Sequence, residues 1–153
     1  MATEPTATIR VNACIDQNMK TTQIDEALIE SLARSQLLAV YLDSKALSLR
    51  FQFTFGPPAD DIVVELLNTA HIVISKDIDD AELLAVVGEV RLTAVSDGGF
   101  SILTKLGYLF KSEANSNAVF TYPSRTMYHF HMEGDVSADV VCGKYTITRL
   151  KQP

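Results

Sequence analysis

Residues 127–142, MYHFHMEGDVSADVVC, alternate between apolar and polar side chains along almost their whole length. The even positions are apolar or small: Tyr128, Phe130, Met132, Gly134, Val136, Ala138, Val140 and Cys142. The odd positions from His129 to Asp139 are polar, and Val141 ends the alternation. Because successive side chains of a β-strand point to opposite faces, this pattern predicts a strand with one buried and one solvent-exposed face. The exposed face would carry the imidazoles and carboxylates of this segment.

The same two-residue period recurs along most of the chain and predicts further strands. They cover residues 8–15, 37–42, 46–55, 61–76, 89–96, 100–110, 118–122 and 144–150. Segment 61–76 is also compatible with a helix, but its β-branched residues favour a strand. In the last strand the apolar positions move to odd numbers, which predicts a bulge or turn at Gly143. Turns and loops are predicted at 43–44, 56–58, 77–80, 97–99 and 112–117.

Residues 22–35 predict a helix. Apolar residues recur there every four positions from Ile24 to Leu32 and give one face for the core. Thr22 is the predicted N-cap, followed by two acidic residues in the first turn, where the helix dipole favours negative charge.

These elements predict a single α+β domain over residues 1–153, with residues 1–7 as a frayed terminus. Short connections favour antiparallel pairing, so we expect a curved, mostly antiparallel sheet of about seven to eight strands packed with the N-terminal amphipathic helix. An alternative is a closed β-barrel in which the helix plugs one end.

Composition and charge argue against several partners and locations. The formal net charge of -6 argues against nucleic-acid binding, which depends on clustered Lys and Arg. No apolar run reaches the ~20 residues of a membrane-spanning helix. The first residues lack the apolar core of a signal peptide, so we expect a cytoplasmic protein. In that reducing compartment Cys14 and Cys142 are expected to be free thiols.

His129, His131 and Glu133 lie two residues apart, so a strand would present all three on one face. Two imidazoles and a carboxylate suit a divalent metal that prefers nitrogen and oxygen ligands. A metal site is therefore one hypothesis, with His71 or Asp135 as a further ligand. The alternative is a solvent-exposed strand face on which histidines pair with acidic residues, since spacing this short also occurs by chance.

No motif for covalent catalysis or nucleotide binding is present: the G-x-S-x-G elbow, the P-loop, the dinucleotide-binding glycines and H-E-x-x-H are all absent. Cys142 falls on the predicted apolar face, where burial suppresses thiol reactivity. We therefore expect a non-catalytic protein. A metal-dependent enzyme using His129, His131 and Glu133 is an alternative.

Aromatic side chains concentrate on the predicted inner faces. They are Phe51, Phe53, Phe55, Phe100, Tyr108, Phe110 and Phe130. In a strongly curved sheet they could line a cavity for a small apolar ligand. Aromatic residues at strand spacing also form ordinary core.

Acidic residues cluster in two regions. They are Asp60, Asp61, Glu65, Asp77, Asp79, Asp80 and Glu82, and then Glu133, Asp135 and Asp139. Complementary charge speeds encounter, so such a surface suits a basic protein partner, although it also serves solubility. The leading expectation is thus a binding protein that acts on a protein partner as an adaptor, chaperone-like module or inhibitor. Exposed strand edges also favour a homodimer.

Overall fold

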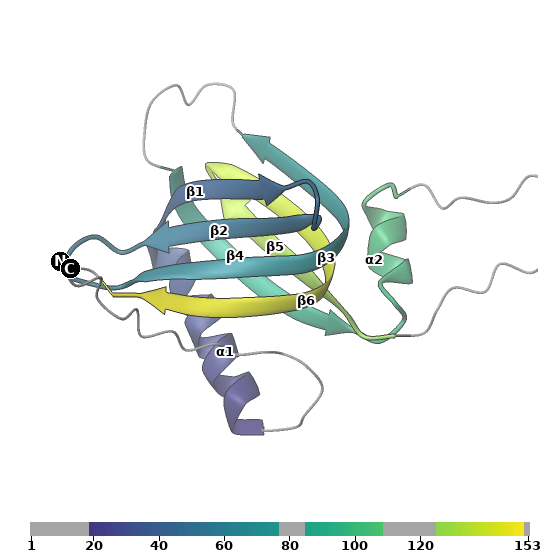
Figure 1. Cartoon of the computed structure of the whole chain (residues 1–153), viewed down its shortest axis with the longest axis horizontal. Helices are drawn as coiled ribbons and strands as arrows, with labels where there is room; N and C mark the ends of the chain where they lie inside the picture. The colour runs from purple at the N-terminus through teal and green to yellow at the C-terminus, as the bar shows by residue number, and fades with distance from the viewer. Residues whose placement is uncertain (1–18, 77–84, 109–124, 152–153) are drawn as a thin grey trace, which may run out of the picture.

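The computed structural model describes residues 19–76, 85–108 and 125–151, and Figure 1 shows their arrangement. In this part of the chain a helix precedes six strands, and a short second helix follows the fourth strand. The elements are α1 (Met19–Ser31), the 3-10 turn η1 (Leu32–Arg34), β1 (Gln36–Asp43), β2 (Ser48–Thr54), β3 (Asp61–Lys76), β4 (Ala85–Val95), α2 (Phe100–Lys105), β5 (Met127–Gly134) and β6 (Val136–Leu150).

The strands form a closed barrel in the order β1-β2-β3-β6-β5-β4, and all neighbouring strands are antiparallel. β4 pairs back to β1 only near Leu37, which lies opposite Ala85. An α+β fold dominated by an antiparallel sheet is therefore confirmed. The described residues hold six strands rather than seven to eight, and the predicted strands 8–15 and 118–122 lie outside them. The closed order matches the alternative that the sequence left open.

The core fills the inside of the sheet. Phe51 stacks on Phe130 with ring centroids 4.9 Å apart and on Phe53 at 6.3 Å, and all three side chains are buried. Helix α1 lies against β4, and Ile29 and Leu32 join the same core cluster. Five of the even positions predicted to be apolar are buried in this core as expected, namely Phe130, Met132, Ala138, Val140 and Cys142, whereas Gly134 is exposed.

The alternating segment 127–142 is two strands of a hairpin rather than one strand. β5 ends at Gly134 and β6 begins at Val136, so the chain reverses at Asp135. Phe130 pairs with Val140, and Tyr128 pairs with Cys142. Partners across this hairpin have numbers of the same parity, so even residues face inward on both strands. The alternation therefore continues through the turn, and the turn cannot be recognised from the alternating pattern alone.

The phase change predicted around Gly143 is present, since Tyr145 and Ile147 are buried. β6 nevertheless runs through Gly143 without interruption. The register shift instead lies on the neighbouring strand β3, between Thr69 and His71.

The strand predicted at 100–110 is wrong, because residues 100–105 form α2. The carboxylate of Asp97 accepts hydrogen bonds from the backbone N–H of Gly99 at 2.9 Å and of Ser101 at 3.0 Å, which favours a helix start. Leu103 is buried in a small cluster with Met127 and Val141. Both of these lie on the outer face of the hairpin, so α2 covers part of that face.

The helix predicted at 22–35 is confirmed as α1 followed by η1. α1 begins at Met19, so Thr22 lies inside the helix rather than at its N-cap. Segment 61–76 is a single strand, as predicted. The connection at 77–84 and the loop at 112–117 lie outside the described residues. None of the helices in the described ranges is long and apolar enough to cross a membrane.

Candidate functional site

Within the described residues, polar groups that could bind a ligand come together on the outer face of the β5–β6 hairpin and in a pocket beside α1. On the hairpin, His129, His131 and Glu133 all occupy outward-facing positions of β5. The register places Asp139 of β6 directly opposite His131. His129, His131 and Asp139 are here called the His–Asp cluster.

The His–Asp cluster is held by short contacts. Asp139 Oδ1 lies 2.8 Å from His129 Nε2 and 2.7 Å from His131 Nδ1. The other ring nitrogen of His131, Nε2, lies 3.0 Å from Glu133 Oε1. The two imidazole rings are 5.9 Å apart between centroids. One carboxylate oxygen therefore joins the two imidazoles, and a second carboxylate holds the far side of His131.

These contacts favour the protonated form of His131. An ionised carboxylate only accepts hydrogen bonds, and both ring nitrogens donate in the imidazolium form. Partial burial lowers the pKa of His131, but the hydrogen bonds and negative charges of Asp139 and Glu133 outweigh it and raise the pKa above its ordinary value.

The two further ligands proposed from sequence do not join the His–Asp cluster. Asp135 Oδ2 accepts a hydrogen bond from the backbone N–H of Val86 at 2.8 Å and so ties the hairpin to β4. His71 packs edge-on against Tyr108, and Val141 lies between His71 and His129 in the sheet. Asp139 was counted only as surface charge from the sequence. Recognising a turn at Gly134-Asp135 would have placed it opposite His131.

A second group on the same face shares His131. Glu89, His131 and Glu133 also bring one ligand atom each within 4.8 Å of one another. Glu89 Oε1 is already paired with Arg91 Nε at 2.6 Å. The His–Asp cluster is the less exposed of the two groups and the one with two imidazoles.

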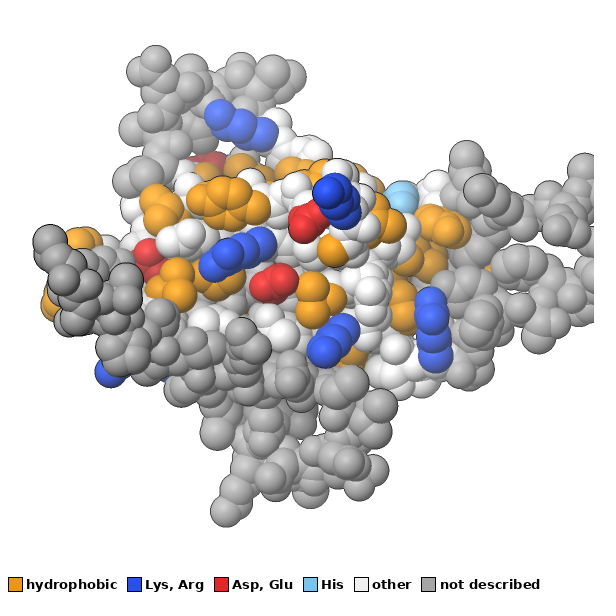
Figure 2. Space-filling model, in the orientation of Figure 1, with side chains coloured by type: hydrophobic (Ala, Val, Ile, Leu, Met, Phe, Trp, Pro, Cys, Tyr) orange, Lys and Arg blue, Asp and Glu red, His pale blue; other side chains and the backbone are white. Residues whose placement is uncertain are grey.

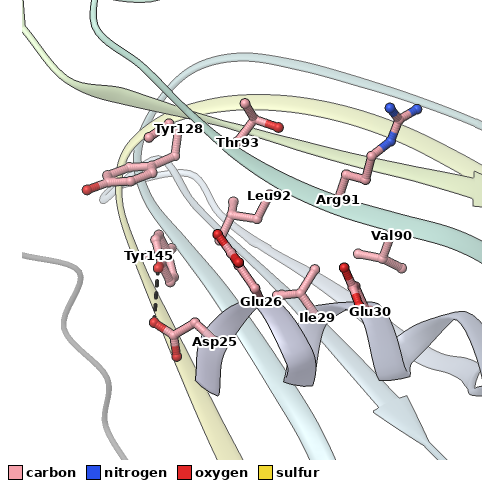
Figure 3. A pocket seen from close by; sticks show the side chains of 11 residues that line it. Asp25, Glu26, Ile29, Glu30, Val90, Arg91, Leu92, Thr93, Tyr128 and Tyr145 are labelled. Carbon is pink, nitrogen blue, oxygen red and sulfur yellow. Dashed lines mark hydrogen bonds between the residues drawn. The ribbon is translucent and has the colours of Figure 1, made fainter. Parts of the chain in front are cut away.

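The pocket lies between α1 and the sheet and has a volume of about 310 Å³ (Figure 3). It is here called the α1–β4 pocket. Its lining residues are Asp25, Glu26, Ile29 and Glu30 of α1, Val90 to Ala94 of β4, Tyr128 of β5 and Tyr145 of β6. The side chains of Glu26 and Glu30 point toward Leu92 and Val90, whereas the guanidinium of Arg91 points away from α1. The charges turned toward the cavity are therefore negative.

Asp25 is the buried acid of this pocket, with 4% of its surface exposed. Its Oδ2 accepts a hydrogen bond from the hydroxyl of Tyr145 at 3.1 Å, while Oδ1 is buried without a hydrogen-bond partner among the described residues. Burial raises the pKa of Asp25, and the hydrogen bond from Tyr145 offsets this only in part. Burial and the neighbouring Asp25 also raise the pKa of Tyr145, so its hydroxyl stays protonated and donates.

The other candidate groups lie elsewhere. Burial raises the pKa of Cys142 to about 12, as expected for a thiol in the core. Cys14 lies outside the described residues. The aromatic residues expected to line a cavity do not line the α1–β4 pocket: Phe51, Phe53 and Phe130 fill the core, and Phe55 and Phe100 are exposed. Phe110 lies outside the described residues.

The acidic region at 60–82 is described only in part. Asp61 is buried and accepts a hydrogen bond from Gln52 Nε2 at 3.2 Å, and residues 77–82 lie outside the described ranges. Figure 2 shows a face on which Lys and Arg side chains alternate with Asp and Glu among hydrophobic ones.

A scan of protein-family models and a search of curated proteins found no match to this chain.

Proposed function

We propose that the protein is a non-catalytic binding protein that takes a small organic amine into the α1–β4 pocket. The observation that carries this function is Asp25, a buried carboxylate that lines the pocket and has one oxygen without a hydrogen-bond partner among the described residues. Burying a charge without a partner is costly, and a cationic ligand would remove that cost. Groups perturbed in this way gather at functional sites.

The surroundings of Asp25 favour a cation with an apolar body. Glu26 and Glu30 add negative charge at the rim, and Arg91 is turned outward and paired with Glu89. Ile29 and Leu92 supply apolar walls. Tyr128 and Tyr145 meet edge to face with centroids 4.9 Å apart, and aromatic rings of this kind also attract cations. The volume suits a ligand of about ten non-hydrogen atoms, at the small end of known ligand sites.

The test compares phenethylamine with 2-phenylethanol and phenylacetate, which have nearly the same shape but are neutral and anionic. Binding is followed by amide NMR shifts of the full-length protein. We expect the amine to bind at least tenfold more tightly than either analogue and to shift residues 90–94. Asp25→Asn should abolish the preference for the amine, whereas the matched charge change Glu65→Gln on the outer sheet should leave it intact. Equal affinity for all three compounds, or an unchanged preference in Asp25→Asn, would contradict the proposal.

A second candidate function, association with a protein, is supported by β1. Beyond Leu37 this strand has no partner on its β4 side within the described residues. The same stretch exposes large apolar side chains at Leu38, Tyr41 and Leu42. An unpaired, apolar strand edge is a surface on which another strand can add, and a second copy of this chain offers a matching edge.

A further inference from the structure

We propose that His129, His131 and Asp139 bind a divalent transition-metal ion on the outer face of the β5–β6 hairpin. This site lies on the face of the sheet opposite the core and shares no residue with the α1–β4 pocket, so it is independent of the amine ligand. Imidazole nitrogens together with a carboxylate oxygen suit Zn²⁺, Co²⁺, Ni²⁺ and Cu²⁺ better than Mg²⁺ or Ca²⁺.

The three donor atoms already converge. Each of the three residues brings one ligand atom within 4.8 Å of the others, and Asp139 Oδ1 lies 2.8 Å from His129 Nε2 and 2.7 Å from His131 Nδ1. In a tetrahedral site with metal–nitrogen bonds of ~2.0–2.1 Å, neighbouring donors are ~3.3 Å apart. Opening the present contacts by roughly half an ångström is within the reach of small side-chain rotations. The ion would replace the protons that now join each imidazole to the carboxylate.

Glu133 has a supporting role at this site. A histidine that ligates a metal commonly donates its other ring N–H to a carboxylate, which fixes the tautomer and the ring orientation. Glu133 Oε1 stands at Nε2 of His131 at 3.0 Å, and this leaves Nδ1 for the ion. Glu133 is therefore a positioning residue, although its spacing in the sequence suggested that it is a ligand.

The backbone holds the donors in place. β5 is paired on both sides, with β4 and with β6, and His131 lies between Arg91 and Asp139 in these pairings. His129 and His131 are mostly buried on a face that α2 partly covers. Three protein donors on paired strands leave the fourth position of a tetrahedral ion open to water or to a further ligand.

The test titrates the full-length, tag-free protein with ZnCl₂ by calorimetry and by NMR of the imidazole signals. The chain contains three histidines, so each signal can be assigned. We expect one ion per chain, with shifts of the His129 and His131 signals and none of His71. His129→Gln, His131→Gln and Asp139→Asn should each weaken binding at least 100-fold. Glu133→Gln should weaken it about 10–100-fold, as loss of an outer carboxylate does.

His71→Gln is the matched control, because it removes the remaining imidazole from the same face of the sheet and should leave affinity unchanged. Glu133 is 59% exposed, so Glu133→Gln tests the site with little risk to folding. Absence of saturable Zn²⁺ binding would overturn the proposal. So would undiminished affinity in the folded His129→Gln/His131→Gln double variant, or shifts confined to His71.

Discussion

Asp25 lies in the proposed binding site, and the burial of its charge is expected to lower the free energy of unfolding. The sequence marked it as an acid in the first turn of a helix, where the helix dipole favours negative charge. Its burial could not be read from the sequence, because the hydrogen-bond partner Tyr145 lies 120 positions away. The two histidines of the His–Asp cluster could be grouped from the sequence, because His129 and His131 lie two residues apart on one predicted strand. Asp139 was missed because only the folded hairpin places it between them.

Asp25→Asn should stabilise the protein at neutral pH. The pKa of Asp25 is raised in the folded state, so the folded chain holds the proton more tightly than the unfolded chain, where the pKa is about 3.9. Stability is therefore fully present below about pH 4 and falls as the pH rises through the folded pKa. Removing the charge should raise the free energy of unfolding at pH 7 by about 1 kcal/mol.

Urea unfolding from pH 4 to pH 8 measures this effect. The gain in Asp25→Asn should shrink toward low pH, where wild-type Asp25 is itself neutral. Glu26→Gln, a change at the exposed neighbouring acid, should shift the free energy of unfolding by less than about 0.5 kcal/mol. If Asp25→Asn instead loses both stability and amine binding, the role of Asp25 is to stabilise the fold and not to bind the ligand.

At the scale of elements, the β5–β6 hairpin shows how a correct periodicity led to a wrong boundary. Alternation shows which side chains face inward. When even-numbered residues face inward on both strands of a hairpin, the alternation does not reveal the turn between them. Gly134-Asp135 is a residue pair typical of turns, but the sequence analysis, which followed the alternation, predicted no turn there. α2 was missed in a similar way, because Phe100 and Ile102 fit a strand as well as a helix. In the structure the carboxylate of Asp97, which accepts hydrogen bonds from the backbone N–H groups of Gly99 and Ser101, favours the helix.

Gly134→Ala should strongly destabilise the hairpin. A Cβ at this position would overlap the carbonyl oxygen of Val86, and Gly88 N would lie 3.1 Å away. Backbone atoms of a paired strand cannot move aside as a flexible side chain can, so we expect a loss of about 3 kcal/mol in the free energy of unfolding. Chemical denaturation followed by circular dichroism measures it.

Gly143→Ala is the matched control on β6. There the nearest atom to an added Cβ would be Asn68 Cβ at 3.4 Å, an ordinary contact. We expect a change below about 1 kcal/mol for this variant. Equal losses in the two variants would show that glycine flexibility, rather than the close approach to β4, governs this hairpin.

At the scale of the whole molecule, local periodicity predicted the class of the fold but not the order of its strands. Most strands are visible in their own residues, and β1 and β2 pair as their short connection suggests. β5 and β6 are the exception, because the alternation predicts them as one strand. The pairs that close the barrel, β3 with β6 and β1 with β4, join segments far apart in the sequence. Side-chain pattern in a single sequence carries no information on which distant edges meet.

The pairing between β1 and β4 is short, and along the rest of β1 the described residues offer no partner on that side. We propose that a second copy of the chain docks there. Leu42, 61% exposed, lies on this part of β1. We expect sedimentation velocity to show a dimer at tens of micromolar. Leu42→Lys should yield a monomer, because charge on a strand edge opposes pairing. Phe55→Lys places the same charge at an exposed apolar residue just after β2 and should leave the dimer intact. A wild-type monomer throughout, or equal effects of the two substitutions, would exclude β1 as the site of association.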